Sequence, residues 1–152
     1  MPEVFFYQTN SEQEFTLRRI LCKSRKAGWR ILVRGAKQDR IEMLDDYLWK
    51  FPEDEFLPHG MSGGDCDHLH PILLTTENEP FEAREALVLI DGAKTEPNEV
   101  AALQRVSVVF ESRDIEIVRS ARTLWKALNE KGVPLVLWIE EAGGWVKKAS
   151  NR

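Results

Sequence analysis

Two continuous apolar runs decide the fold class of this chain: Pro71-Ile72-Leu73-Leu74-Thr75 and Ala86-Leu87-Val88-Leu89-Ile90. Neither run alternates with polar residues, as a strand with one face in water would. Such runs are typical of strands covered on both faces, as in parallel sheets flanked by helices. The sequence therefore predicts an α/β domain with a mostly parallel sheet. The residues expected to be buried in it include Leu32, Leu73, Leu74, Val88 and Ile90.

Strand and helix patterns alternate along the rest of the chain, which favours one layered α/β domain. We expect a capping box of Ser11 and Glu14 at the start of the first helix and Ser112 as the cap of the last helix. The expected strands are 4–7, 30–34, 71–75, 86–90, 105–110 and 133–139, and the expected helices end near Gly28, Lys50 and Lys131. A single domain is predicted over residues 1–140, followed by a loose tail over residues 141–152.

The composition is that of an ordinary globular protein, with 152 residues, 43% hydrophobic and 30% charged. A net charge of −4 disfavours direct binding to nucleic acid, which needs clustered positive charge. The chain has no apolar run of the ~18 residues that a membrane span requires and no signal-peptide pattern. The two cysteines, Cys22 and Cys66, form no disulfide framework, so a cytoplasmic location is expected.

The motifs of common catalytic sites are missing from the sequence. The turn Arg34-Gly35-Ala36-Lys37 follows a strand, but it lacks the glycine spacing of a dinucleotide or phosphate loop. Cys66, His68 and His70, with His59 nearby, are metal-ligand types in a spacing that structural zinc sites do not use. A solvated loop explains them better, and no cofactor is expected. A small nucleotide- or metal-dependent enzyme on a doubly wound sheet remains the alternative function.

The last expected helix carries a basic side. Arg119, Arg122 and Lys126 fall together opposite the apolar stripe, and Trp125 lies at the border. Such a ridge suits an acidic peptide with an apolar anchor, since charge steers the peptide and a pocket holds it. From the helix pattern alone, an ordinary solvated surface is the favoured explanation.

Two aromatic residues, Trp49 and Phe56, lie where a helix gives way to a proline-stopped loop, which is a plausible binding ledge. The segment Leu48-Trp49, Glu55-Phe56 and Pro58-His59 resembles the signature of the chi subunit of bacterial DNA polymerase III. The segment Ala121-Arg122-x-x-Trp125-Lys126 matches the pattern of that family's last long helix. The resemblance covers roughly residues 4–138.

The resemblance implies a fold like that of nucleotide-binding domains, without the nucleotide site, and a non-catalytic role in DNA replication. Chi proteins connect the clamp loader, classically through the psi subunit, to the C-terminal tail of single-stranded DNA-binding protein, which is acidic and ends in Pro-Phe. By resemblance, Arg122 and Lys126 would hold the carboxylates of the tail. Trp49 and Phe56 would wall in its terminal Phe, so Trp49→Ala is expected to weaken binding most. Val118 replaces a basic residue of the family, and Arg119 is the candidate substitute.

Overall fold

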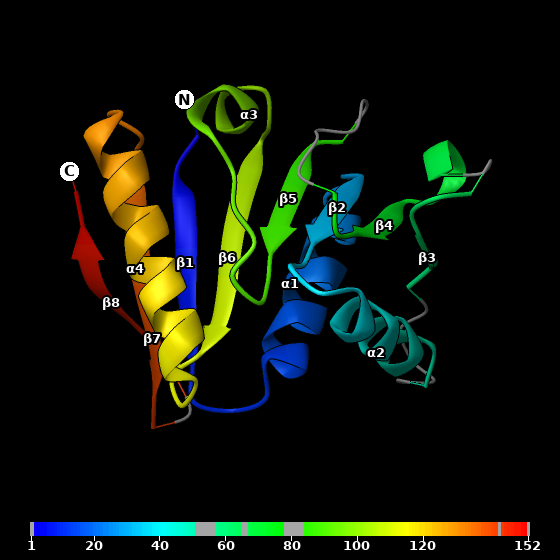
Figure 1. Cartoon of the computed structure of the whole chain (residues 1–152), viewed down its shortest axis with the longest axis horizontal. Helices are drawn as coiled ribbons and strands as arrows, with labels where there is room; N and C mark the ends of the chain where they lie inside the picture. The colour runs from blue at the N-terminus through cyan, green and yellow to red at the C-terminus, as the bar shows by residue number, and fades with distance from the viewer. Residues whose placement is uncertain (1, 51–56, 65–66, 78–83, 143, 152) are drawn as a thin grey trace.

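The computed structural model describes residues 2–50, 57–64, 67–77, 84–142 and 144–151. An eight-stranded sheet of order β3-β4-β2-β5-β6-β1-β7-β8 forms the centre of the molecule (Figure 1). All neighbouring strands are parallel except β7 and β8, which are antiparallel. The elements are β1 (Val4–Thr9), α1 (Gln13–Lys26), β2 (Ile31–Arg34), α2 (Gln38–Lys50), β3 (His59–Met61), the 3-10 turn η1 (Asp67–Leu69), β4 (Ile72–Thr75), β5 (Ala86–Leu89), α3 (Pro97–Ala101), β6 (Arg105–Glu111), α4 (Ile115–Glu130), β7 (Leu135–Glu141) and β8 (Gly144–Ser150).

The helices divide between the two faces of the sheet. Val4 and Phe6 of β1 point to the face that α3 and α4 cover, whereas Ile31 and Val33 of β2 point to the face that α1 and α2 cover. Each face therefore has its own hydrophobic core. The predicted α/β fold is confirmed, and the five residues expected to be buried, Leu32, Leu73, Leu74, Val88 and Ile90, are all at most 3% exposed.

Residues 144–150 correct the prediction of a loose tail. They form strand β8, which pairs with β7 from Val136 to Glu141. The turn between the two strands uses Ala142, a residue with positive φ (46°). The end of the chain is tied down by Asn151, whose side chain accepts from the Leu135 amide at 2.7 Å and donates to the Val133 carbonyl at 2.8 Å. Gly144 thus begins a paired strand, which the prediction of a loose tail did not consider.

The two predicted helix caps are wrong: a carboxylate distant in sequence takes the first amide of α1, and a different local residue caps α4. The Ser11 hydroxyl hydrogen-bonds Thr9 and Glu140 instead of capping α1. The amide of Gln13, at the start of α1, donates to the carboxylate of Glu111 in β6 at 3.0 Å. At the start of α4 the cap is Asp114 rather than Ser112, and its carboxylate accepts from the Ile117 amide.

A buried ion pair holds the carboxyl end of β2 to α3. Arg34 is fully buried, and its guanidinium donates to both carboxylate oxygens of Glu99, at 2.7 and 2.8 Å. The same guanidinium donates to the carbonyls of Glu77 and Lys94. Burial raises the pKa of Glu99, but the hydrogen bonds from Arg34 and Thr95 and the charge of Arg34 outweigh it, so the pKa lies below its ordinary value.

We expect Glu99→Ala to lower the free energy of unfolding by about 3 kcal/mol, because it removes the carboxylate that pairs with the buried Arg34. Since the pKa of Glu99 is depressed by folding, its contribution is present above pH 4.5 and is lost as the pH falls through the folded pKa. The difference between wild type and Glu99→Ala in urea denaturation should therefore shrink in acid. Glu96→Ala, at an exposed neighbouring carboxylate, is the control, and an equal loss there would contradict the assignment.

Candidate peptide-binding site

Helix α4 is amphipathic and lies with its apolar side on the sheet. Ala121, Leu124 and Leu128 are buried at intervals of three and four residues, which places them on one side of the helix. Half-buried Trp125 packs edge-on against the ring of Phe6 in β1, with the ring centroids 5.1 Å apart. Trp125 therefore anchors α4 to the sheet and leaves only part of its surface to a ligand.

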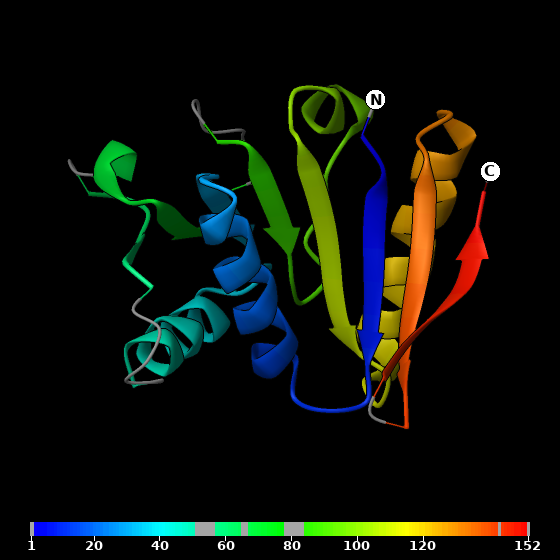
Figure 2. The ribbon, with the colours of Figure 1, turned by 180° about the vertical axis from the view of Figure 1, so that it is seen from behind.

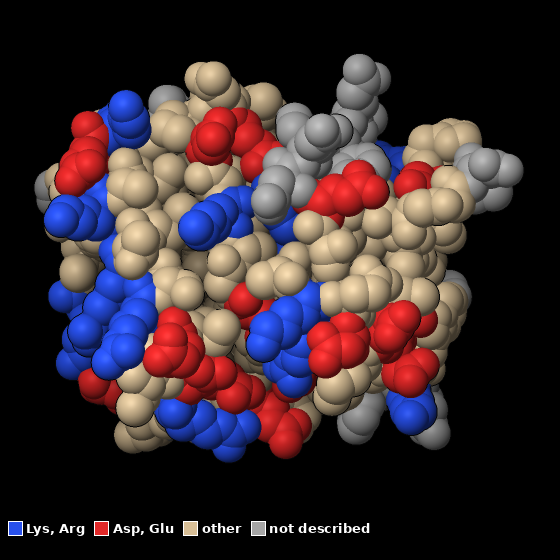
Figure 3. All heavy atoms as spheres, viewed as in Figure 1, with Lys and Arg blue, Asp and Glu red and all other residues tan. Residues whose placement is uncertain are grey.

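The outer side of α4 carries the predicted basic residues, and all three are exposed. Arg119 donates to Glu116 at 3.3 Å, in an ion pair whose two side chains are 70% and 81% exposed. Within the part of the chain that the structure describes, Arg122 and Lys126 form no salt bridge. The space-filling view shows Lys and Arg side chains gathered on the α4 side of the molecule (Figure 3). Arg122 and Lys126, one turn apart, thus leave their charges to an outside partner.

Trp49 lies near the end of α2, and its side chain is 53% exposed. Its ring lies against the ring of His59 in a tilted contact, with 4.2 Å between centroids and an interplanar angle of 35°. The buried His59 is held in turn by the Leu57 carbonyl, 2.7 Å from Nδ1, and by Asp45, 3.2 Å from Nε2. Sequence reasoning missed His59 as a support for Trp49, because a ring contact between a helix and a strand depends on the fold. Phe56 lies outside the described residues.

The structure does not bring Trp49 and the basic side of α4 together. Helix α2 packs on β3 and β4, whereas α4 packs on β6 and β7, on the other face of the sheet. The two helices are therefore separated by the thickness of the sheet. They are also displaced sideways, because the three strand spacings from β4 to β6, at about 4.8 Å each, amount to roughly 14 Å. The expected single pocket of Trp49, Arg122 and Lys126 is therefore wrong in its geometry, and one short peptide would not reach all three.

The histidines that were considered as metal ligands make other contacts in the structure. His59 is engaged with Leu57 and Asp45, and the ring of His70 packs directly on the backbone of Gly60. Cys66 lies outside the described residues. Among the residues that are described, no group of three or more His, Cys, Asp or Glu could hold a metal ion.

The crevice that binds nucleotides in related layered folds is filled by carboxylates. It lies where strands β1 and β6 end side by side and their following helices, α1 and α4, leave to opposite faces. There the first amide of α1 is taken by Glu111, and the Gln13 side chain donates to Asp91 at 3.1 Å. Negative groups thus occupy the helix N-terminus that a phosphate would need.

Fold and site together define a small α/β protein whose exposed groups suit the binding of other proteins. The family model for the DNA polymerase III chi subunit, HolC, matches residues 1–136. The DNA polymerase III subunit chi of Pseudomonas aeruginosa is 26% identical over 140 residues, which cover 89% of this chain and 94% of that protein. The chain therefore belongs to the DNA polymerase III chi subunit family, whose members are non-catalytic accessory subunits in DNA replication. A search of the described residues finds no helix that is long and apolar enough to cross a membrane.

We expect Trp125→Ala to lower the free energy of unfolding by about 3 kcal/mol, because the Trp125 ring joins α4 to Phe6 in the core. Arg122→Ala and Lys126→Ala should change it by less than about 0.5 kcal/mol, since both side chains are exposed. Urea denaturation followed by circular dichroism measures all three. A loss at Arg122 as large as that at Trp125 would show that the basic side of α4 serves the fold.

Proposed function

We propose that this chain binds the acidic C-terminal tail of single-stranded DNA-binding protein at the basic side of α4 and links that protein to the clamp-loader assembly. The observation that carries the proposal is the pair Arg122 and Lys126, which is exposed, lies on one side of α4 and has no ion pair among the described residues. Two cations one helical turn apart reach the carboxylates of one short acidic segment.

The apolar end of the tail needs a contact close to these cations. Trp125 and Val118 are half-buried on α4 and pack at the edge of its core. Because they flank the basic residues, they are better placed for a terminal Phe than Trp49 is. Arg119 already pairs with Glu116, so we assign it a minor part in holding the tail.

A linking subunit needs two separate surfaces, and Trp49 supplies a candidate for the second one. An exposed tryptophan whose ring is held from behind by a buried histidine resembles the rigid aromatic anchors found at the centre of protein interfaces. We assign this surface to the psi subunit or the clamp loader, because the tail site lies on the other face.

Calorimetric titration with a peptide of the acidic tail, ending in Pro-Phe, tests the α4 site. Each of Arg122→Ala and Lys126→Ala should weaken binding about two- to fivefold, as expected for exposed charge pairs worth ~0.2–1 kcal/mol. Added salt should weaken binding to the wild type more than to the double variant, because screening acts on the charges that the variant lacks.

Two controls sharpen this titration. Arg19→Ala removes an exposed charge from α1, on the other face of the sheet, and should bind the peptide like the wild type. Trp49→Ala should also bind like the wild type. The α4 assignment fails if Trp49→Ala abolishes peptide binding while Arg122→Ala and Lys126→Ala leave it unchanged.

The second surface is tested by co-purification of the clamp-loader assembly from cells that carry a tagged copy of the chain. Trp49→Ala should reduce the recovered assembly by tenfold or more, since removal of a central aromatic anchor costs ~2 kcal/mol or more. The Arg122→Ala variant, at the tail site, is the matched comparison and should recover the assembly in full. Equal recovery with Trp49→Ala would place the clamp-loader contact elsewhere.

A further inference from the structure

One half of the sheet has a face that no helix of the described chain covers. Helices α1 and α2 pack over β2, β4, β5 and β6, and from β1 their core takes only the partly buried Tyr7. Helix α4 covers the opposite face of β1, β6 and β7. Seen from behind, the strands β1, β7 and β8 are therefore bare on the side turned to the viewer (Figure 2).

Aromatic side chains line this bare face in a continuous row. The rings of Phe5 and Tyr7 stack with their centroids 6.3 Å apart. The ring of Trp145 in β8 meets Tyr7 edge-on at 5.5 Å, and Trp138 of β7 lies directly beside Tyr7 in the register of the sheet. All four residues are only half-buried, so π surface is offered to solvent where an ordinary open sheet face would be polar.

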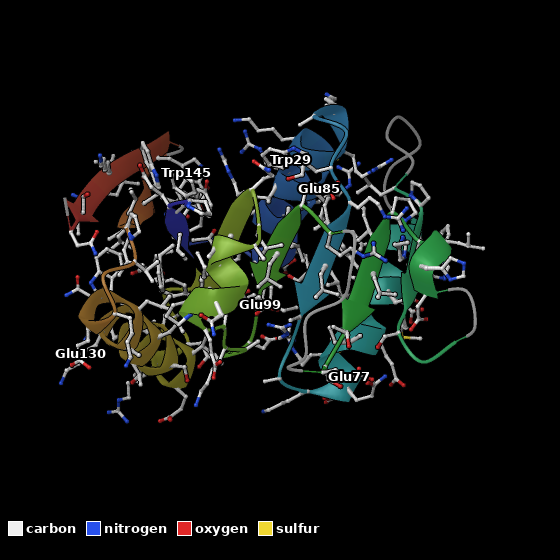
Figure 4. All side chains as sticks on the ribbon, turned by 90° about the horizontal axis from the view of Figure 1, so that it is seen from above. Trp29, Glu77, Glu85, Glu99, Glu130 and Trp145 are labelled. Atoms are coloured by element: carbon white, nitrogen blue, oxygen red, sulfur yellow. The ribbon has the colours of Figure 1, made fainter. Side chains whose placement is uncertain are left out.

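The row continues through a cation to the end of α1. The guanidinium of Arg105 lies 4.7 Å from the ring centroid of Phe5 and 5.8 Å from that of Trp29. Trp29 and Trp145 lie on the same side of the sheet, opposite α4 and its Glu130 (Figure 4). From Trp145 to Trp29, the face thus presents aromatic rings and the guanidinium of Arg105 across the four strands β8, β7, β1 and β6.

Further positive charge borders the row. Lys147 of β8 is exposed and pairs in register with Trp138, which places both side chains on the bare face. Glu14 and Arg18 mark the flank of α1 that faces α2, since Glu14 pairs with Arg40 and Arg18 acts on Tyr47. Lys23 is exposed on the opposite flank, toward the bare face.

Two further ionisable groups on the face, Tyr7 and Glu140, leave this charge in place. Burial raises the pKa of Tyr7 in spite of the neighbouring Arg105, so the phenol stays neutral. Glu140 accepts hydrogen bonds from Thr9, Asn10 and Ser11, which lower its pKa and hold the carboxylate at the carboxyl end of the strands. A polyanion would therefore follow Arg105, Lys147 and Lys23, away from Glu140.

We propose that this face, the aromatic platform of Phe5, Tyr7, Trp29, Trp138 and Trp145 with Arg105 and Lys147, binds single-stranded DNA directly. Aromatic residues on an open sheet stack on unpaired bases, and flanking cations hold the phosphates. An extended peptide pairs with the unpaired backbone groups of an edge strand, whereas this face offers mainly aromatic rings and cations. The net charge of −4 argues against tight binding by the whole chain, and the platform is a local exception to it.

The platform depends on the hairpin of β7 and β8. Trp145 and Lys147 lie beyond residues 1–136, where the family model matches. The contact is also separate from the tail site, because α4 lies on the other face of the sheet. It would let the chain touch the strand itself next to the protein that coats it.

Fluorescence anisotropy with a labelled oligothymidylate of about 15 nucleotides, and with no single-stranded DNA-binding protein present, tests the proposal. The wild-type chain should bind with a dissociation constant of ~10–100 µM at low salt, and a duplex of the same length should bind at least tenfold more weakly, since its bases are not free to stack. Trp145→Ala should weaken binding about tenfold and Lys147→Glu severalfold. Lys37→Glu, an exposed charge reversal before α2, is the control and should bind like the wild type.

Lys147 is exposed, so Lys147→Glu tests the platform without disturbing the core, and thermal melting checks that Trp145→Ala is folded. Wild-type binding that is absent at ~1 mM protein, or equal for Lys147→Glu and Lys37→Glu, would overturn the proposal. A dimer in sedimentation that Trp145→Ala dissolves, with no oligonucleotide binding, would instead assign the face to a second copy of the chain. The tail titration is independent of these outcomes, because it uses α4 variants and a peptide.

Discussion

The connection from β1 to β2 is the constraint on which the rest of the structure depends. The chain leaves β1, passes over β6 and β5 as α1, and enters the sheet again as β2. This crossing commits α1 and α2 to one face and to the β3 half of the sheet. Strands β5 and β6 lie between β2 and β1 in the sheet. Helices α3 and α4 pack on the other face, where they cover β1, β6 and β7. Two cores result, and every exposed surface of interest lies on one side or the other of this division.

Much of the fold could be predicted because local sequence patterns determine it. Runs such as Leu87-Val88-Leu89 have no polar alternation, and this alone requires cover on both faces. The missed features depend on distant partners. Glu111, about a hundred residues away in sequence, accepts the hydrogen bond from the first amide of α1. It therefore replaces the local capping box that was predicted from Ser11 and Glu14. Strand β8 is rich in exposed lysine and gains its order from β7 and Tyr7, which no local pattern reveals.

The candidate site divides in the same way. The spacing of Arg122 and Lys126 fixes their common side of a helix, so sequence reasoning placed them correctly on the exposed face of α4. The position of Trp49 relative to that helix is set by strand order, which the apolar runs leave open. Strand order separates Trp49 from Arg122 and Lys126. The structure therefore has two surfaces in place of the single pocket that the resemblance implied. The aromatic platform escaped notice for the same reason, since Tyr7 and Trp145 meet only when β1 and β8 flank β7.

Separate surfaces on a rigid sheet suit a linking subunit better than one composite pocket. A single pocket would make its ligands compete, whereas surfaces that share no side chain allow all of them to be held at once. When one contact is made, the second becomes intramolecular, and its effective concentration rises without any new interaction. Contacts that are each weak, such as the exposed charges of α4, then suffice in combination. The buried pair of Arg34 and Glu99 contributes by fixing α3 to β2, so that the two cores, and the surfaces above them, keep one relative position.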